Sequence, residues 1–169
     1  DIYNTQAHVP LVYSSINNAE SENKFSKKIK NFLGVKYIIT HTSFMHSIYR
    51  CLSFLKNRNP KRNQIIVPRY SCMTFAHAII ESGLKIQYCD QNTSDLSINI
   101  NSLKSVSNKE TLALICVNHL GLSNDMEAIS NFCNKSDINL IEDLGYSFGT
   151  TYNGKKLGTF GLISNFSFY

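Results

Sequence analysis

The sequence predicts an α/β fold of three layers, in which helices flank a mostly parallel sheet. Short β-branched runs alternate with segments of helical length, which is the pattern of strand–helix–strand units. Most of these runs are apolar throughout, as in strands that are buried on both faces of a sheet. With 43% hydrophobic and 17% charged residues, the chain has enough apolar side chain to form a core.

The expected strands are short runs bounded by polar or turn-forming residues. They are Tyr37–Thr40, Gln64–Val67, Lys85–Cys89, Thr111–Val117, Asn139–Glu142 and a last one near Ser164–Phe168. Short connections between strands and helices favour parallel pairing. Ligands of such sheets bind at the carboxyl ends of the strands, so the residues that follow each strand are the candidates for function.

The expected helices lie between these runs. They cover approximately residues 43–56, 73–82 and 126–135, with a short helix at 100–106 inside the polar stretch 90–109. Gly83 is a suitable stop for the second helix, and Asn124-Asp125 supplies a cap for the third. An earlier amphipathic segment places Phe25, Ile29 and Phe32 on one face, so its lysines form the solvated side.

The chain is expected to form one domain over residues 1–169, with an N-terminal arm and first helix over 1–30. No run approaches the roughly 18 apolar residues of a membrane span, so we expect a cytoplasmic protein without membrane contact. The net charge of +5 comes without a nucleic-acid-reading motif, and we expect no such partner. The five cysteines form no CxxC pair, which favours reduced thiols over disulfides or a metal site.

Small hydroxyl residues follow the first expected strand. Thr42 and Ser43 lead into a helix, where backbone N–H groups and hydroxyls can bind a phosphate. The same residues are also ordinary helix caps, and both interpretations remain open. The second expected strand runs into Pro68–Met73, a turn that could contact a flat ring or an anion, or could serve only as a turn.

Two adjacent acids, Glu142 and Asp143, end a buried run. Buried carboxylates are costly unless they have a partner. The partner could be a protonated ring nitrogen, a metal or a salt-bridging residue; without a nearby histidine at ligand spacing, we favour the ring nitrogen over the metal. The later glycine-rich stretch Asn153–Gly161 predicts a hairpin or loop, and it lacks the Gly-Lys-Ser/Thr of a P-loop.

In combination these features resemble the DegT/StrS family of sugar aminotransferases. The most specific matches are Ile141-Glu142-Asp143, Gly149, the segment Tyr152–Gly161 and Phe166-Ser167-Phe168. Matches in the expected order upstream are Phe32–Tyr37, Thr42-Ser43, Ile66–Pro68, His119-Leu120-Gly121 and Asp125-Met126. The resemblance covers nearly the whole chain.

The resemblance implies the large domain of a fold-type-I enzyme that holds pyridoxal 5'-phosphate (PLP). Thr42 and Ser43 would bind the cofactor phosphate at a helix N-terminus, and Ser167 would add its hydroxyl. Asp143 would pair with the pyridine nitrogen and keep it protonated. These four residues, together with two that depart from the family pattern, form the expected cofactor site.

The chain departs from the family pattern at several positions. Cys72 stands where the family has a ring-stacking aromatic residue, and Tyr146 stands where it has a glutamine near the ring oxygen. A polarisable sulfur and a hydroxyl can still make those contacts. His41 replaces a glycine in the phosphate turn, where we expect backbone strain. We expect His119 to be a structural histidine outside the site.

The resemblance places the Schiff-base lysine just past Tyr169. We therefore expect a truncated large-domain part, without a catalytic residue of its own and without the small domain. The implied reaction transfers an amino group from glutamate to a nucleotide-linked keto-sugar for polysaccharide or antibiotic-sugar synthesis, in a homodimer. A PLP-dependent sugar dehydratase of the same family, and a non-catalytic remnant that binds a phosphate ligand or a protein partner, remain alternatives.

Overall fold

The computed structural model describes residues 19–168, and the side chains from residue 23 onward. The expected N-terminal arm over residues 1–18 lies outside the described residues. One compact unit ends at Thr40, and a second begins at His41. The first unit contains helix α2, Ala19–Leu33. Its Ile29 and Leu33 are buried, while Phe25 and Phe32 are about two-fifths exposed, so the buried stripe is narrower than the sequence predicted.

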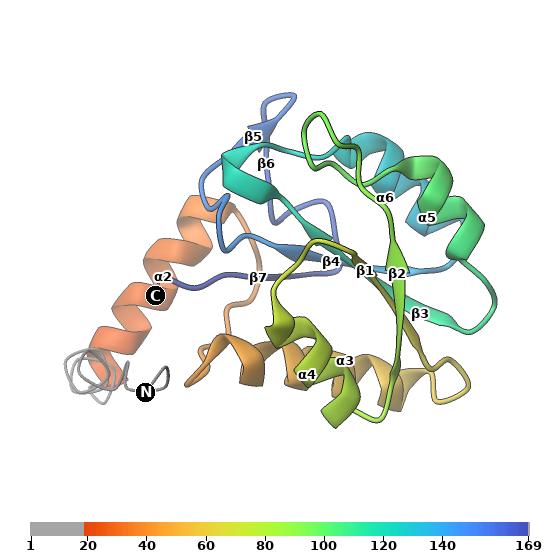
Figure 1. Cartoon of the computed structure of the whole chain (residues 1–169). Coiled ribbons are helices and arrows are strands. Elements are labelled where there is room, and N and C mark those ends of the chain that lie inside the picture. Colours follow the sequence, from red (N-terminus) through yellow and green to blue (C-terminus); the bar gives the residue numbers. More distant parts are fainter. Residues whose placement is uncertain (1–18, 169) are drawn as a thin grey trace, which may run out of the picture. The chain divides into compact units, whose positions relative to one another are not determined.

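The second unit is built around a five-stranded parallel sheet in the order β2-β1-β3-β4-β7. Its strands are β1 Gln64–Pro68, β2 Lys85–Cys89, β3 Thr111–Val117, β4 Asn139–Asp143 and β7 Ile163–Asn165. Helices α3 (Phe44–Arg58) and α4 (Met73–Glu81) cover one face, and α5 (Ile100–Val106) and α6 (Met126–Lys135) cover the other (Figure 1). The predicted three-layer α/β fold is confirmed.

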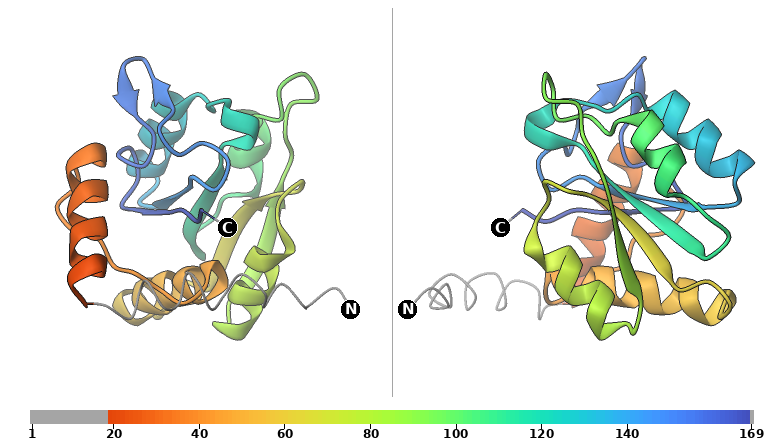
Figure 2. Two further views of the ribbon diagram at one scale, coloured as in Figure 1. Left: turned by 90° about the vertical axis from the view of Figure 1, so that its left-hand side faces the viewer. Right: turned by 45° about the vertical axis from the view of Figure 1, so that its right-hand side comes forward.

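The central strand β3 shows why the apolar runs were continuous. All of its residues are buried. Ile115 and Val117 pack with α3 and α4, whereas Leu114 and Cys116 pack with α5 and α6. Since side chains alternate between the faces of a strand, a sheet covered on both sides needs apolar residues at every position. Figure 2 shows the two helical layers from two further directions.

The helix ends follow the capping signals in the sequence. Asp125 caps α6, and its carboxylate accepts a hydrogen bond from the Ala128 N–H at 3.0 Å. Helix α4 ends at Glu81, and Gly83 follows with a φ of +63°. This left-handed conformation is one that glycine adopts without steric cost, which explains the stop. Both predicted signals are confirmed.

Two expected strands differ from the structure. Tyr37–Thr40 forms no strand among the described residues, and Tyr37 and Ile39 are 74% and 78% exposed. A strand needs the backbone of a neighbour, which local composition does not provide. The last strand begins at Ile163 and ends at Asn165, so the Phe-Ser-Phe segment leaves the sheet.

The glycine-rich stretch, for which the sequence predicted a hairpin or loop, begins with a tight hairpin. Strands β5 (Thr151–Tyr152) and β6 (Lys155–Lys156) pair antiparallel. Asn153 and Gly154 form the turn with φ of 49° and 77°, and Asn-Gly is the favoured pair for such two-residue turns. The hairpin directs the following segment back toward the end of β4.

The cysteines are all free thiols. Cys89, Cys116 and Cys133 are buried, Cys51 is half-buried and Cys72 is exposed. Over residues 19–168, no helix has the length and apolar character needed to cross a membrane. In the same range, no group of three or more His, Cys, Asp and Glu side chains is arranged to hold a metal ion.

Candidate functional site

The candidate site lies at the carboxyl edge of the sheet, on the face that α3 and α4 cover. In β4, Ile141 packs with these two helices. Because side chains alternate along a strand, Asp143 shares that face and Glu142 has the opposite one. Helix α3 ends where β1 starts, and α4 begins after β1 ends. The first turns of both helices therefore lie toward the same edge as Asp143.

Asp143 is a buried carboxylate without a positive partner. It is 5% exposed, and its Oδ1 accepts a hydrogen bond from the Gly145 N–H at 2.9 Å. In the described part of the chain no lysine, arginine or histidine forms an ion pair with it. Burial raises the pKa of Asp143 to about 6, and the Gly145 N–H opposes this rise. A cation at this position would be stabilised by the carboxylate.

Glu142 is fully buried on the other face, where backbone N–H groups donate hydrogen bonds to both of its carboxylate oxygens. Its Oε2 accepts from the Gly158 N–H at 2.7 Å, and its Oε1 accepts from the N–H groups of Phe160 at 2.7 Å and Gly161 at 2.6 Å. Burial raises the pKa of Glu142, and these three hydrogen bonds act against the rise. Glu142 therefore anchors the glycine-rich segment, a role that we did not predict.

Close packing explains the glycines in this segment. A Cβ on Gly161 would lie 2.5 Å from the Leu140 carbonyl oxygen. A Cβ on Gly158, whose φ is +90°, would lie 2.6 Å from Leu144 Cδ1. Only glycine lets the backbone approach Glu142 this closely. The spacing of these glycines is the sequence signal that could have indicated a close backbone contact, although it does not identify Glu142 as the residue contacted.

The first turn of α3 contains the residues expected to bind a phosphate. Ser43 is the N-cap, and its Oγ accepts from the His46 N–H at 3.1 Å. Thr42 Oγ1 lies 3.5 Å from His46 Nδ1, and both hydroxyl residues are exposed. The capping interpretation is thus realised in the structure. It is compatible with phosphate binding, since other N–H groups of a first helical turn have no partner within the helix.

The strain expected at His41 is absent. The described residues other than glycine with positive φ are Leu96, Leu120, Asp137 and Asn153, so His41 adopts a conformation open to any residue. Its ring lies 5.4 Å from that of His46, in an edge-to-face arrangement. Burial, followed by the charges of His46 and Arg50, lowers the pKa of His41. The prediction of strain was wrong because the turn reaches the helix without a left-handed residue.

The remaining expected residues lie on loops at the same edge. Cys72 is exposed at the N-cap of α4, and its thiol donates to Thr74 Oγ1 at 3.1 Å. Tyr146 is 58% exposed, in the turn that follows Asp143. Ser167 lies in the segment that follows β7, between two aromatic neighbours. The rings of Phe166 and Phe168 lie 4.9 and 5.1 Å from the ring of Phe148.

His119 makes the contacts of a structural residue. It begins the short 3-10 helix His119–Gly121 and is 8% exposed. Its Nε2 lies 3.1 Å from the Tyr70 carbonyl oxygen, and the two rings are 5.3 Å apart. Burial lowers the pKa of His119, while the contact with the carbonyl raises it. These contacts explain the buried position of the His119 side chain, and no ligand is needed to explain it.

Three buried polar atoms without a partner lie on segments that follow strands at this edge. They are Asn118 Nδ2 after β3, Ser147 Oγ after β4, and Asn165 Nδ2 at the end of β7. Buried polar groups in folded proteins almost always have partners, so such atoms mark a place for water or a ligand. Of the three, Asn165 shares a face of the sheet with Asp143, and its free donor and the uncompensated carboxylate together fit a polar ligand that carries a positive charge. The residues present therefore fit PLP with a protonated ring nitrogen.

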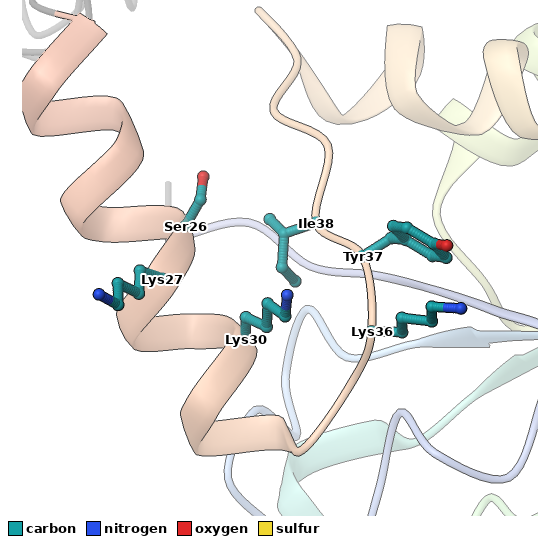
Figure 3. A pocket seen from close by; sticks show the side chains of 6 residues that line it. All are labelled: Ser26, Lys27, Lys30, Lys36, Tyr37 and Ile38. Atoms are coloured by element: carbon teal, nitrogen blue, oxygen red, sulfur yellow. The ribbon is translucent and has the colours of Figure 1, made fainter.

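The first unit contains a basic hollow of its own. It measures about 390 Å³ and is lined by Ser26, Lys27, Lys30, Lys36, Tyr37 and Ile38. Figure 3 shows that Lys30 points toward Ile38, whereas Lys27 and Lys36 point away from each other. Since the three ammonium groups do not converge, they do not form a shared anion site. The hollow gives no support to the alternative of a phosphate-binding remnant.

Comparison with known proteins identifies the family. A model of the DegT/DnrJ/EryC1/StrS aminotransferase family matches residues 6–169. The chain belongs to this family. A GDP-4-keto-6-deoxy-D-mannose 3-dehydratase from Yersinia pseudotuberculosis is 33% identical over 152 residues, which cover 88% of this chain and 39% of that protein. A GDP-perosamine synthase from Vibrio cholerae is 28% identical over 146 residues, with coverage of 86% and 39%.

Solved structures of family members share the fold. The Escherichia coli GDP-4-keto-6-deoxy-D-mannose-3-dehydratase with bound hydrated PLP matches with a TM-score of 0.80 and 29% identity, over 93% of this chain and 44% of that one. Helicobacter pylori PseC, an aminotransferase of pseudoaminic acid biosynthesis, matches with a TM-score of 0.78 and 28% identity, over 87% and 39%. The chain thus spans less than half the length of these relatives. The cofactor that the sequence suggested is present in the dehydratase structure.

Proposed function

We propose that this chain forms the PLP-binding part of an enzyme that acts on nucleotide-linked keto-sugars. The observation that carries the proposal is Asp143, a buried carboxylate with no cationic partner among the described residues, in a chain of this aminotransferase family. A protonated pyridine nitrogen would supply the missing charge. Burial strengthens such a pair because the surrounding dielectric is low and water is excluded.

Each end of the cofactor has a proposed set of contacts. Bound PLP supplies an electron sink for the carbon that carries the amino group. Asp143 holds the proton on the ring nitrogen. Thr42, Ser43 and the first turn of α3 bind the phosphate together with Ser167.

Two further side chains complete the proposed site. The Cys72 sulfur contacts the ring, and the Tyr146 hydroxyl donates a hydrogen bond near the ring oxygen. The location of both residues on loops at the carboxyl edge of the sheet is compatible with these contacts. Neither side chain reproduces the family's usual residue.

The proposed reaction is amino transfer from glutamate to the keto group of a nucleotide-linked sugar. The support comes from relatives such as the GDP-perosamine synthase and the Helicobacter pylori UDP-4-amino-4,6-dideoxy-N-acetyl-beta-L-altrosamine transaminase, both 28% identical to the chain. We propose that the enzyme is a cytoplasmic homodimer and that its product enters polysaccharide or antibiotic-sugar synthesis.

A sugar 3-dehydratase is the second candidate. Two GDP-4-keto-6-deoxy-D-mannose 3-dehydratases are 33% and 34% identical to the chain, compared with 28% for the transaminases above. The residue that the gene encodes about three positions past Tyr169 distinguishes the candidates: a lysine supports transfer and a histidine supports dehydration. Incubation with PLP, glutamate and a nucleotide keto-sugar provides a direct test, because mass spectrometry separates an aminated from a deoxygenated product.

PLP binding is the first test of the proposal. Asp143→Asn removes the charge that would pair with the ring nitrogen, and we expect the PLP dissociation constant to rise roughly 10- to 100-fold, the usual effect of losing a charged hydrogen bond. Absorbance titration measures this constant. Asp90→Asn is the matched control, because Asp90 also follows a strand of the sheet but its side chain is 62% exposed. Equal affinities in the two variants would contradict the assignment of Asp143.

A further inference from the structure

Asn165 connects strand β7 to helix α3 through its side chain. Its Oδ1 accepts a hydrogen bond from Ser47 Oγ at 2.5 Å and a weaker one from Cys51 Sγ at 3.7 Å. Both donors lie on α3, one turn apart. Asn165 is 4% exposed, so water does not compete strongly for these hydrogen bonds. The carboxamide thus holds the helix against the last strand of the sheet.

The backbone of Asn165 joins the same residue to the strand of Asp143. The two residues are partners in the parallel pairing of β4 with β7, so their side chains share a face of the sheet. The Leu144 N–H, next to Asp143 in the chain, donates to the Asn165 carbonyl oxygen at 2.8 Å. Asn165 is therefore bonded both to α3 and to the segment that carries the candidate ring-nitrogen partner.

Helix α3 extends this connection to the candidate phosphate site. The Ser47 N–H donates to the Ser43 carbonyl oxygen at 3.1 Å, so Ser47 lies one helical turn after the N-cap. A continuous series of hydrogen bonds thus runs from Ser43 through Ser47 and Asn165 to the end of β4. A rigid cofactor that is held at both ends needs a fixed distance between these anchors.

The remaining amide atom of Asn165 points to a role beyond packing. Oδ1 accepts from the two donors of α3, and Nδ2 is buried without a hydrogen-bond partner. An unpaired buried donor costs stability, which an apolar side chain of similar size would avoid. A residue that only filled space would not carry this cost, so the value of the side chain lies in the hydrogen bonds of its oxygen with α3.

We propose that Asn165 is a positioning residue, which sets the distance between the phosphate-binding turn of α3 and Asp143. This inference rests on the proposed PLP site and deepens it. Pyridoxal, which lacks the phosphate, needs only the ring contacts, whereas PLP needs both anchors at the correct separation. Loss of the connection should therefore weaken the contribution of the phosphate more than the binding of the ring.

The test compares PLP with pyridoxal in the wild-type protein and in Asn165→Ala. The measured quantity is the ratio of the pyridoxal to the PLP dissociation constant. We expect Asn165→Ala to lower this ratio about tenfold, the equivalent of one hydrogen bond's net contribution, with a smaller change for pyridoxal alone. Equal weakening for both ligands is the result of a purely structural role, and it would overturn the inference.

Ser47→Ala provides a second route to the same connection. Alanine is a strong helix former, so this variant keeps α3 intact and remains informative if Asn165→Ala fails to fold. We expect the ratio to fall in Ser47→Ala as well, and the double variant to show little further change, because both substitutions break one connection. An unchanged ratio in Ser47→Ala, or full additivity, would contradict the proposal.

The outcomes also separate this inference from the proposed function. If the wild-type protein binds PLP and Asp143→Asn weakens it, while the ratio is insensitive to Asn165 and Ser47, only the positioning role is overturned. If the wild-type protein does not distinguish PLP from pyridoxal, or binds neither, the proposed phosphate site fails and the inference fails with it.

Discussion

Glu142 and Asp143 are neighbours with the same functional group, yet they lie in opposite environments. Both are buried, at 0% and 5% exposure. Glu142 accepts hydrogen bonds from three backbone N–H groups, and Asp143 accepts one. On the face toward α5 and α6, the carboxylate of Glu142 has all of its hydrogen-bond partners. On the face toward α3 and α4, the carboxylate of Asp143 has no cation to balance its charge. The number of donors, rather than burial, separates the structural acid from the candidate functional one.

The largest expected effect is on stability, and it concerns Glu142 on the face toward α5 and α6. Glu142→Ala leaves the N–H groups of Gly158, Phe160 and Gly161 buried without an acceptor, and we expect it to lower the free energy of unfolding by roughly 3–5 kcal/mol. Urea denaturation measures the change. The control is Glu110→Ala, whose carboxylate is 59% exposed and whose loss should cost no more than about 0.5 kcal/mol. Similar losses for both variants would remove the distinction between the faces.

Asp143→Asn should act in the opposite direction on the ligand-free protein. The folded pKa of about 6 exceeds the ordinary value of 3.8, so between these values the folded state binds more protons and wild-type stability falls as the pH rises. The neutral amide removes this cost. We expect the variant to gain about 3 kcal/mol over the wild type at pH 7 and to match it below about pH 4. Parallel pH profiles in chemical denaturation would contradict the buried, unpaired state of Asp143.

Gly161→Ala tests the close packing on the Glu142 face. The added methyl group would contact the Leu140 carbonyl oxygen at 2.5 Å, and relief of this clash must move the backbone away from Glu142. We expect a loss of about 2 kcal/mol, the usual cost of overpacking. Gly154→Asn is the control, because nothing lies within 4 Å of that position and asparagine tolerates its positive φ. Equal thermal stabilities of the two variants would show that the contact is not tight.

Ser43→Ala has the smallest expected effect on stability, about 1 kcal/mol for the loss of a helix cap. If the first turn of α3 also binds the phosphate, the variant should weaken PLP more than pyridoxal. Thr42→Ala is a useful comparison, since its hydroxyl makes only a long contact of 3.5 Å with His46 and its loss should affect stability little. A stability loss in Ser43→Ala with unchanged PLP affinity would leave capping as its only role.

The sequence predicted the parts of the fold that depend on local pattern. Continuous apolar runs identified the parallel strands because burial on both faces constrains every residue. The glycine-rich stretch 153–161 predicted a hairpin or loop, and Asn153-Gly154 forms the hairpin turn because both residues accept positive φ. Tyr37–Thr40 has the composition of a strand, but pairing depends on a neighbour that composition does not specify.

The candidate site was predictable only in part. The pair Glu142-Asp143 could be singled out because acids at the end of a buried strand are costly without partners, whereas the choice of Asp143 came from the family resemblance. The saturation of Glu142 depends on contacts with residues 158–161, and the bond from Ser47 to Asn165 joins residues 118 positions apart in the sequence. Such contacts follow from packing of distant segments. A single amino-acid sequence shows which residue types are available for such contacts, but it does not show which distant residues will touch.

The opposite environments of the two acids also favour one alignment of β4 in the sheet. Leu140 and Ile141 would fit the apolar layer on either face, so they do little to prevent a shift of the strand by one position. Such a shift would exchange the faces of Glu142 and Asp143. It would place the longer acid under α3 and leave the N–H groups of the glycine-rich segment without their acceptor. The two carboxylates therefore favour one register of β4, whereas Leu140 and Ile141 fit both registers.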